Sequence, residues 1–223
     1  MSLDFKAVLF DLDGTLLDSI EDIADSMNNV LARNGYEIHE LGEYRKFIGD
    51  GIAMLVKRAL PDNKGNEAQQ RFLKEYQEEY DRNRNVKTRP YIGIPEVLKN
   101  LNSRRVKIAV LSNKPDLPAK KCVSDFFPEN HFEVVLGQKD EIAKKPDPEG
   151  ALMIAGIMNI LPEHILYVGD SDVDMKTAVS AGMYPAGALW GYRDMEELRN
   201  NGAKSLIKTP FEILELLHSG FQG

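Results

Sequence analysis

Two groups of acidic residues follow short apolar runs in this sequence, and their types and spacing suit the binding of a divalent cation. Asp11 and Asp13 come directly after the run at residues 7–10, and Asp170 and Asp174 come after the run at residues 164–169. A short apolar run is typical of a buried strand. In an open parallel sheet, ligands bind beyond the carboxyl ends of the strands. The sequence therefore predicts that these acids line a crevice at one edge of a sheet.

The repulsion between two of these acids indicates which kind of ion would bind. Carboxylates of Asp11 and Asp170 at neighbouring strand ends would repel each other by ~4 kcal/mol at ~4 Å and an effective dielectric of ~20. One of them would then become protonated unless a cation were bound. Carboxylates together with a substrate phosphate are typical ligands of Mg²⁺. The sequence has no His or Cys cluster that would indicate zinc, and no EF-hand spacing that would indicate a calcium loop.

Two further segments carry groups that could hold an anion such as phosphate. The strand predicted at residues 106–112 ends in Ser112, whose hydroxyl can donate to an oxygen, and the backbone amide of Asn113 follows it. The segment Lys144-Lys145-Pro146-Asp147-Pro148 is stiffened by its two prolines. We expect Lys145 to face the acids and Lys144 to be solvated. Taken alone, a serine at a strand end is more often a helix or turn cap than a ligand, and a pair of lysines is usually part of a solvated surface.

The remaining pattern predicts an α/β protein. Strands are predicted at residues 132–136, 184–189 and 205–207 in addition to those already mentioned, and helices at residues 94–103 and from 117. Strands that alternate with helices indicate right-handed βαβ units and a mostly parallel, doubly wound, Rossmann-like sheet. Residues 19–32, 41–60 and 67–84 instead read as helices without intervening strands, interrupted at Gly49-Asp50-Gly51, with Ser19 and Asp22 as an approximate capping box. We therefore expect a core domain of residues 1–17 and 87–223 and an inserted helical domain of residues 18–86.

The four motifs together resemble those of the haloacid dehalogenase superfamily of phosphohydrolases. Residues 11–15 match its opening motif Asp-x-Asp-Gly-Thr, Ser112 its second motif, Lys145 its Lys-Pro-x-Pro motif, and residues 169–174 its Gly-Asp-x-x-x-Asp motif. The motifs occur in the order of the superfamily, and the resemblance covers nearly the whole chain. It implies that the inserted helical domain is the cap that closes over the crevice and selects the leaving group.

The resemblance also implies a mechanism and a role for each motif residue. Asp11 would attack phosphorus and form an aspartyl-phosphate, and Asp13 would protonate the leaving oxygen and later activate water. Mg²⁺ would be held by the carboxylates of Asp11 and Asp170 and the backbone carbonyl of Asp13, with support from Asp174. Ser112, Asn113 and Lys145 would bind the phosphoryl group.

The cap segment at residues 47–60 resembles that of phosphoglycolate phosphatases, which have an Ile/Val-Gly-x-Gly run before a Leu/Val-x-x-Arg-Ala-Leu ending. Gly49 and Gly51 would let the backbone approach a small substrate, and Arg45 could pair with a substrate carboxylate. The alternative is that the two glycines only join two helices and that Arg45 is solvated.

The composition limits the partners of the chain. A formal net charge of −7 argues against broad capture of nucleic acid or of an anionic membrane. The single cysteine, Cys122, excludes an internal disulfide and favours a cytoplasmic location, and no signal peptide or membrane-spanning segment is evident. The oligomeric state, monomer or dimer, stays open.

The sequence thus predicts a Mg²⁺-dependent enzyme that hydrolyses a small phosphorylated metabolite, with 2-phosphoglycolate as the first substrate to test. Activities of the same superfamily stay open as alternatives: a sugar phosphomutase similar to β-phosphoglucomutase, a pyrophosphatase or a nucleotidase. A protein that binds a phosphorylated ligand without catalysis is the alternative from another class, although the complete set of acids argues against it.

Overall fold

The structure is a computed structural model that describes residues 4–61 and 65–218 of the 223-residue chain. The chain divides into two compact units: unit 1 comprises Met1–Leu17 and Pro90–Gly223, and unit 2 comprises Asp18–Arg89. The core range predicted from the sequence also includes residues 1–3 and 219–223, which lie outside the described residues. The roles of these units as catalytic core and cap stay predictions.

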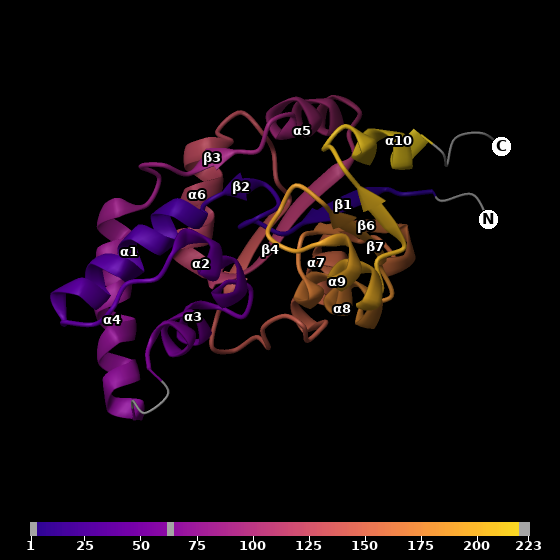
Figure 1. The fold of residues 1–223 in the computed structure, drawn as a ribbon. Coiled ribbons are helices and arrows are strands. Elements are labelled where there is room, and N and C mark those ends of the chain that lie inside the picture. The colour runs from indigo at the N-terminus through magenta and orange to yellow at the C-terminus, as the bar shows by residue number, and fades with distance from the viewer. Residues whose placement is uncertain (1–3, 62–64, 219–223) are drawn as a thin grey trace. The chain divides into compact units, whose positions relative to one another are not determined.

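Unit 1 contains a six-stranded sheet in the order β5-β4-β1-β6-β7-β8, in which every neighbouring pair is parallel (Figure 1). Its strands are β1 (Ala7–Phe10), β4 (Lys107–Pro115), β5 (Val134–Gln138), β6 (Ile165–Gly169), β7 (Tyr184–Ala188) and β8 (Ser205–Ile207). The short strands β2 (Leu17–Asp18) and β3 (Arg89–Pro90) form a separate two-stranded sheet. The predicted parallel α/β fold is therefore confirmed.

Helices cover both faces of this sheet because its central strands are apolar on both sides. Val8 and Phe10 of β1 pack in one core cluster with helices α5 (Ile94–Ser103), α6 (Asp116–Phe126) and α10 (Glu212–His218). Ala7 and Leu9 pack in a second cluster with α7 (Glu149–Met158) and α8 (Asp172–Ser180). Successive strand residues point to opposite faces, so a strand buried on both faces reads as the continuous apolar run seen in the sequence.

Some elements of unit 1 differ from the sequence-based expectation. The strand predicted at residues 106–112 continues to Pro115, so that Asn113 and Lys114 belong to β4. The side chains of Asn113 and Lys114 bind polar partners instead of packing in the apolar core. A pattern of apolar residues therefore does not show that the strand includes them. The helices α7 and α9 (Met195–Asn200), the helix α10 and the 3-10 helix η1 (Pro162–His164) were not predicted. The helix α7 is apolar over almost its whole length, and the other three are too short to complete a periodic pattern.

Unit 2 contains four helices among its described residues: α1 (Ile20–Arg33), α2 (Leu41–Phe47), α3 (Ile52–Ala59) and α4 (Asn66–Asn83). The predicted capping box at Ser19 and Asp22 is wrong, because the Ser19 side chain makes no capping hydrogen bond. The carboxylate of Asp22 is buried and instead accepts hydrogen bonds from the backbone N–H groups of Lys87 and Thr88 and from the Thr88 hydroxyl. Asp22 therefore joins the two ends of unit 2.

None of the helices formed by residues 4–61 and 65–218 is long and apolar enough to cross a membrane.

Candidate active site

Asp11 lies at the carboxyl end of the central strand β1. Its backbone N–H donates to the carbonyl oxygen of Val168 in β6 (N···O 2.9 Å), which continues the ladder between the two strands by one residue. The chain then turns, because the N–H of Leu16 donates to the carbonyl oxygen of Leu12 (3.0 Å). Asp13 is part of this turn, and Asp11 is 7% exposed. The first acidic pair therefore lies at the end of the sheet where ligands bind in this class of fold.

Asp170 and Asp174 lie at the end of the neighbouring strand β6 and in the first turn of α8. The Oγ atom of Ser171 accepts a hydrogen bond from the Asp174 N–H, and the Asp174 carboxylate accepts hydrogen bonds from the N–H and the hydroxyl of Ser171. This reciprocal capping box fixes the start of the helix. Both aspartates are almost completely buried, at 1% and 0% exposed.

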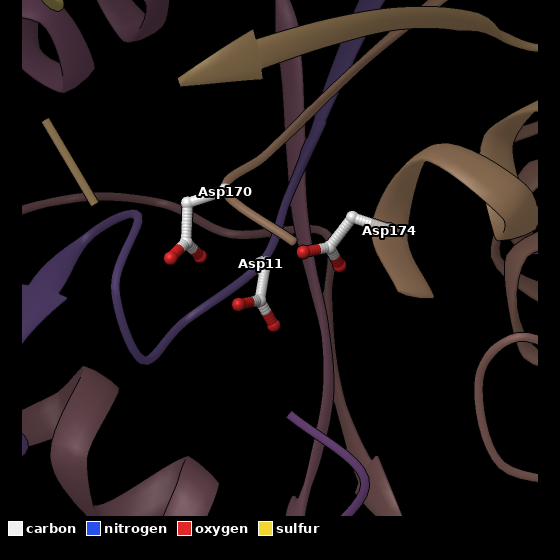
Figure 2. Close-up of side chains that lie close together, drawn as sticks. All are labelled: Asp11, Asp170 and Asp174. Atoms are coloured by element: carbon white, nitrogen blue, oxygen red, sulfur yellow. The ribbon is translucent and has the colours of Figure 1, made fainter. Parts of the chain in front are cut away.

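The carboxylates of Asp11, Asp170 and Asp174 lie close together although the residues are far apart in the sequence. Each offers one oxygen, and these oxygens lie within 4.8 Å of one another. Figure 2 shows the three side chains facing a common region, with Asp174 carried by α8 and Asp11 by the segment after β1. The convergence expected from the strand ends is therefore present for these three acids, whereas the carboxylate of Asp13 does not belong to this group and contacts Lys114 instead.

Lys145 connects two of these acids. Its Nζ atom donates to Oδ1 of Asp11 and to Oδ1 of Asp174, at 2.6 Å in each case, and the side chain is buried. Asn113 fixes the backbone of Lys145, because its side-chain amide donates to the Lys145 carbonyl (3.0 Å) and accepts from the Lys145 N–H (2.9 Å). Lys144 is exposed, as expected.

Ser112 and Asn113 both lie at the end of β4, next to β1 in the sheet. Ser112 is 4% exposed, and its Oγ atom accepts a hydrogen bond from the N–H of Lys114 (3.1 Å), which leaves the hydroxyl proton able to donate to another acceptor. The Asn113 side chain positions Lys145, so a contact of Asn113 with phosphate would use its backbone. Phosphate binding by these two residues stays a prediction.

The cluster of Asp11, Asp170, Asp174 and Lys145 holds three buried carboxyl groups and one ammonium group. Burial raises the pKa of the Asp11 carboxyl well above its ordinary value, and the charge of Asp174 raises it further, whereas Lys145 acts in the opposite direction. Burial raises the pKa of Asp170 to about 7, again with a contribution from Asp174. Burial alone would lower the pKa of Lys145, but the charges of Asp11 and Asp174 outweigh it and raise that pKa well above its ordinary value. The cluster therefore favours a bound cation.

The hydrogen bonds indicate which acids have room for a metal ion. Asp174 accepts four hydrogen bonds, from Lys145, the Tyr167 hydroxyl and the N–H and hydroxyl of Ser171, which use all of its acceptor positions. Among the described residues, Asp170 accepts from the Thr15 hydroxyl and from one backbone N–H, so these donors occupy one acceptor position on each of its oxygens and leave a second one on each. The hard oxygen donors of Asp11 and Asp170 fit Mg²⁺, and Asp174 fits the supporting role.

Three glycines make room for the two acids that follow β6. A Cβ atom at Gly14 or at Gly191 would lie 2.3 Å and 2.2 Å from the nearest side-chain atom of Asp170, and one at Gly169 would lie 2.3 Å from Cβ of Asp174. Gly14 also has a φ of +95°, which residues with side chains rarely adopt. The backbone therefore encloses Asp170 with no space for a methyl group.

Several residues of the site were not found from the sequence. The backbone N–H of Tyr192 donates to Asp170 (2.7 Å), and the indole N–H of Trp190 donates to the carbonyl oxygen of Thr15 (3.0 Å). The ammonium group of Lys114 lies 3.0 Å and 3.2 Å from the two carboxylate oxygens of Asp13. The apolar run before Lys114 predicts that a strand ends there. Nothing in the spacing of the sequence, however, indicates that Lys114 contacts Asp13.

Arg45, Gly49 and Gly51 lie in unit 2, and their contact with a substrate stays a prediction. Arg45 is exposed on α2, and the two glycines have φ values of 121° and 86° in the loop between α2 and α3. Arg58 anchors this loop, because its guanidinium donates to the carbonyl oxygen of Phe47 (3.0 Å) and to the Asp50 carboxylate. The loop therefore has a defined conformation within unit 2.

Comparisons with known proteins agree with this geometry. The family model of haloacid dehalogenase-like hydrolases matches residues 8–188. Phosphoglycolate phosphatase from Aquifex aeolicus (strain VF5) is 37% identical over 187 residues, covering 84% of this chain and 86% of that protein. The enzyme of the same name from Cereibacter sphaeroides (strain ATCC 17025 / ATH 2.4.3) is 37% identical over 193 residues, covering 83% and 86%.

A solved structure with the same fold leads to the same family. The crystal structure of a predicted phosphoglycolate phosphatase from Haemophilus somnus 129Pt has a TM-score of 0.89 and 27% identity, and the match covers 95% of this chain and 97% of that chain. The family match includes β1 to β7 and all four motifs. The resemblance predicted from the sequence is therefore confirmed, and the chain belongs to the haloacid dehalogenase-like hydrolases, a family of enzymes.

Proposed function

We propose that this protein is a Mg²⁺-dependent phosphatase that hydrolyses a small phosphomonoester through an aspartyl-phosphate on Asp11. The observation that carries the proposal is the position of Asp11, whose carboxylate accepts a hydrogen bond from the buried Lys145 and lies beside Asp170 and Asp174. A nucleophilic carboxylate requires a nearby positive charge that draws the phosphoryl group toward it.

The residues of unit 1 would perform the reaction in two steps. In the first step an oxygen of Asp11 bonds to phosphorus, the bond from phosphorus to the ester oxygen breaks, and Asp13 gives that oxygen its proton. In the second step Asp13 takes a proton from water, the water oxygen bonds to phosphorus, and the Asp11 carboxylate leaves. Ser112, Lys145 and the backbone N–H of Asn113 would orient the phosphoryl oxygens.

Mg²⁺ would be held by the carboxylates of Asp11 and Asp170 and by the backbone carbonyl of Asp13, and it would offset the charge of the phosphoryl oxygens. Asp174 would support the site through Lys145, to which it is hydrogen-bonded. Unit 2 would act as the cap, with Arg45, Gly49 and Gly51 as contacts of the leaving group. The anchored loop between α2 and α3 supports this role.

The first substrate to test is 2-phosphoglycolate, because the curated relatives at 37% identity bear the name phosphoglycolate phosphatase. Phosphate release should be measured with 2-phosphoglycolate, a sugar phosphate, a nucleoside monophosphate and pyrophosphate, with Mg²⁺ and with EDTA. We expect release from 2-phosphoglycolate that requires Mg²⁺ and is abolished by Asp11→Asn.

Each other result of this panel identifies an alternative. Isomerisation of the sugar phosphate without free phosphate would indicate a phosphomutase, and preference for pyrophosphate or a nucleotide would change the substrate class. Binding of these compounds without any turnover would indicate a protein that binds a phosphorylated ligand. Full turnover in EDTA would contradict the metal assignment.

A further inference from the structure

A second buried lysine lies at the acid that would transfer protons. The ammonium group of Lys114 is 3.0 Å from Oδ1 and 3.2 Å from Oδ2 of Asp13, and the two side chains are 5% and 13% exposed. Lys145 binds Asp11 and Asp174 instead, so the two lysines of the site have different partners. Each aspartate of the Asp-x-Asp pair therefore has its own ammonium group.

Both backbone groups of Lys114, the N–H and the carbonyl, lie against neighbouring residues. Its N–H donates to Oγ of Ser112 (3.1 Å), and its carbonyl oxygen lies 2.7 Å from where a Cβ atom of Gly137 would be. The pairing of β4 with β5 shifts register between Leu111 and Pro115, and such an irregularity redirects the side chains near it. The direction of the Lys114 side chain is thus set by the end of β4 rather than by Asp13 alone.

Asp13 is also held by its own turn. The N–H of Gly14 donates to the carbonyl oxygen of Leu17 (2.8 Å), and Asp13 forms a β-bridge with Leu17. A fixed ammonium group that reaches both oxygens of a carboxylate restricts rotation of that carboxylate about its last bond. A partly buried ion pair contributes little to stability on balance, so fold stability alone is a weak reason for this contact.

We propose that Lys114 is a positioning residue that holds the carboxyl group of Asp13 in the orientation needed for proton transfer. This inference rests on the proposed function. After the first step Asp13 has given its proton to the leaving oxygen and is a carboxylate, which is the form that Lys114 binds in the structure. The same carboxylate then accepts the proton of the attacking water. Lys114 itself neither gains nor loses a proton.

The dependence of the rate on the leaving group distinguishes a positioning role of Lys114 from a purely structural one. An alkoxide requires a proton as it leaves, whereas p-nitrophenolate leaves without one. We expect Lys114→Met to lower kcat/KM, which reports the steps up to formation of the aspartyl-phosphate, at least about tenfold more for the alkyl phosphomonoester that the wild-type enzyme hydrolyses best than for p-nitrophenyl phosphate. Lys121→Met, which removes an exposed lysine from α6, should leave kcat/KM unchanged for both substrates.

A double-mutant cycle makes the inference specific to Asp13. If Lys114 acts through Asp13, the variant carrying both Lys114→Met and Asp13→Asn should be no slower on the alkyl ester than Asp13→Asn alone. Lys114→Gln replaces Lys114→Met in both measurements if circular dichroism shows that the methionine variant does not fold.

The possible failures are distinguishable. Equal losses on the two substrates, or additive losses in the cycle, would overturn the role of Lys114 and leave the proposed phosphatase activity intact. A wild-type enzyme that releases phosphate from neither ester would overturn both the proposed function and the role of Lys114.

Discussion

Asp170 and Asp174 have the same side chain and lie four residues apart, but their partners give them different roles. The four donors around Asp174 bind its carboxylate fully and connect it to Lys145. Asp170 accepts only two hydrogen bonds among the described residues, and one of its oxygens lies within 4.8 Å of an oxygen of Asp11. At the scale of single residues, the number of hydrogen bonds therefore separates a supporting acid from one that can bind a cation.

The fit of Gly191 against Asp170 gives a prediction at this scale. A Cβ atom at residue 191 would lie 2.2 Å from Cβ of Asp170 and 2.5 Å from the carbonyl oxygen of Gly14, so Gly191→Ala must displace one of them. We expect a loss of about 1–3 kcal/mol in the free energy of unfolding, typical of overpacking, and a reduced affinity for Mg²⁺. Urea unfolding and calorimetric titration with Mg²⁺ would measure the two effects.

Gly156→Ala is the matched control for this substitution. Gly156 lies in α7, and apart from the backbone of that helix no atom of the described residues lies within 4 Å of where its Cβ would be. Alanine in a helix is about 0.5–1 kcal/mol more favourable than glycine, so this variant should be more stable and bind Mg²⁺ normally. Unchanged Mg²⁺ affinity in Gly191→Ala would show that the segment between β7 and α9, which contains Gly191, does not fix the position of Asp170.

The sequence predicts the residues of the site whose signal is local. Asp11 and Asp170 could be located because an apolar run stops directly before each of them, and adjacent strand ends bring such residues together. Lys114 and the N–H of Tyr192 could not be located in this way. Their partners, Asp13 and Asp170, are 101 and 22 residues away, and a backbone donor has no signal in the side-chain pattern.

At the scale of elements, the central strands and most helices could be predicted from the periodicity of apolar residues. The helix at residues 94–103 and the strand at residues 205–207 have the expected limits. The pattern failed at α1, where Ser19 and Asp22 have the spacing of a capping box but Asp22 binds the chain at Lys87 and Thr88 instead. Local spacing cannot reveal a partner that is more than 60 residues away.

The contact of Asp22 with the end of unit 2 predicts a large cost of its removal. Asp22→Ala would leave the N–H and the hydroxyl of the buried Thr88 without their acceptor. We expect a loss of about 2–4 kcal/mol in the free energy of unfolding, because each unsatisfied buried group costs about 1–3 kcal/mol. Urea unfolding followed by circular dichroism would measure this loss.

Asp25→Ala is the control on the same helix. Its carboxylate lies 2.7 Å from Nζ of Lys87, but both side chains are about half exposed. Exposed ion pairs contribute little to stability because solvent screens them, so this variant should lose much less stability than Asp22→Ala. Equal losses in the two variants would contradict the importance of the buried contact.

At the scale of the whole molecule, the order of the strands explains why one site forms from four distant motifs. The strand β1 lies between β4 and β6. Asp11 follows β1, Ser112 to Lys114 lie at the end of β4, and Asp170 follows β6. The chain leaves β1 toward β4 on one side and later returns to β6 on the other, which makes β1 the point where the strand order reverses. Such points are the common ligand sites of open α/β sheets.

The raised pKa values predict how pH and Mg²⁺ together affect stability. Asp170 has a pKa of about 7 in the folded, metal-free protein, above that of an unfolded aspartate. Its proton therefore stabilises the fold fully at low pH, and this contribution is lost as pH rises through 7, with a slope of up to about 1.4 kcal/mol per pH unit. Mg²⁺ competes with this proton, so it should raise the melting temperature more at pH 8 than at pH 5.5.

Differential scanning calorimetry of wild type, Asp170→Asn and Asp172→Asn would test this prediction. Asp172 lies in the same helix start and forms an exposed pair with Lys176, so its variant should keep the Mg²⁺ effect. Asp170→Asn should lose it. Stabilisation by Mg²⁺ that is independent of pH, or that survives in Asp170→Asn, would contradict the assignment of the metal to this carboxylate.

Trapping the phosphorylated form of Asp11 would test its role as the nucleophile. The wild-type protein would be mixed with substrate and Mg²⁺, quenched during turnover, reduced with borohydride and digested for mass spectrometry. Borohydride converts an aspartyl-phosphate into homoserine, so we expect homoserine at position 11 in this sample and not in one prepared with EDTA. Turnover with an unmodified residue 11, or with the reduced residue at another aspartate, would contradict it.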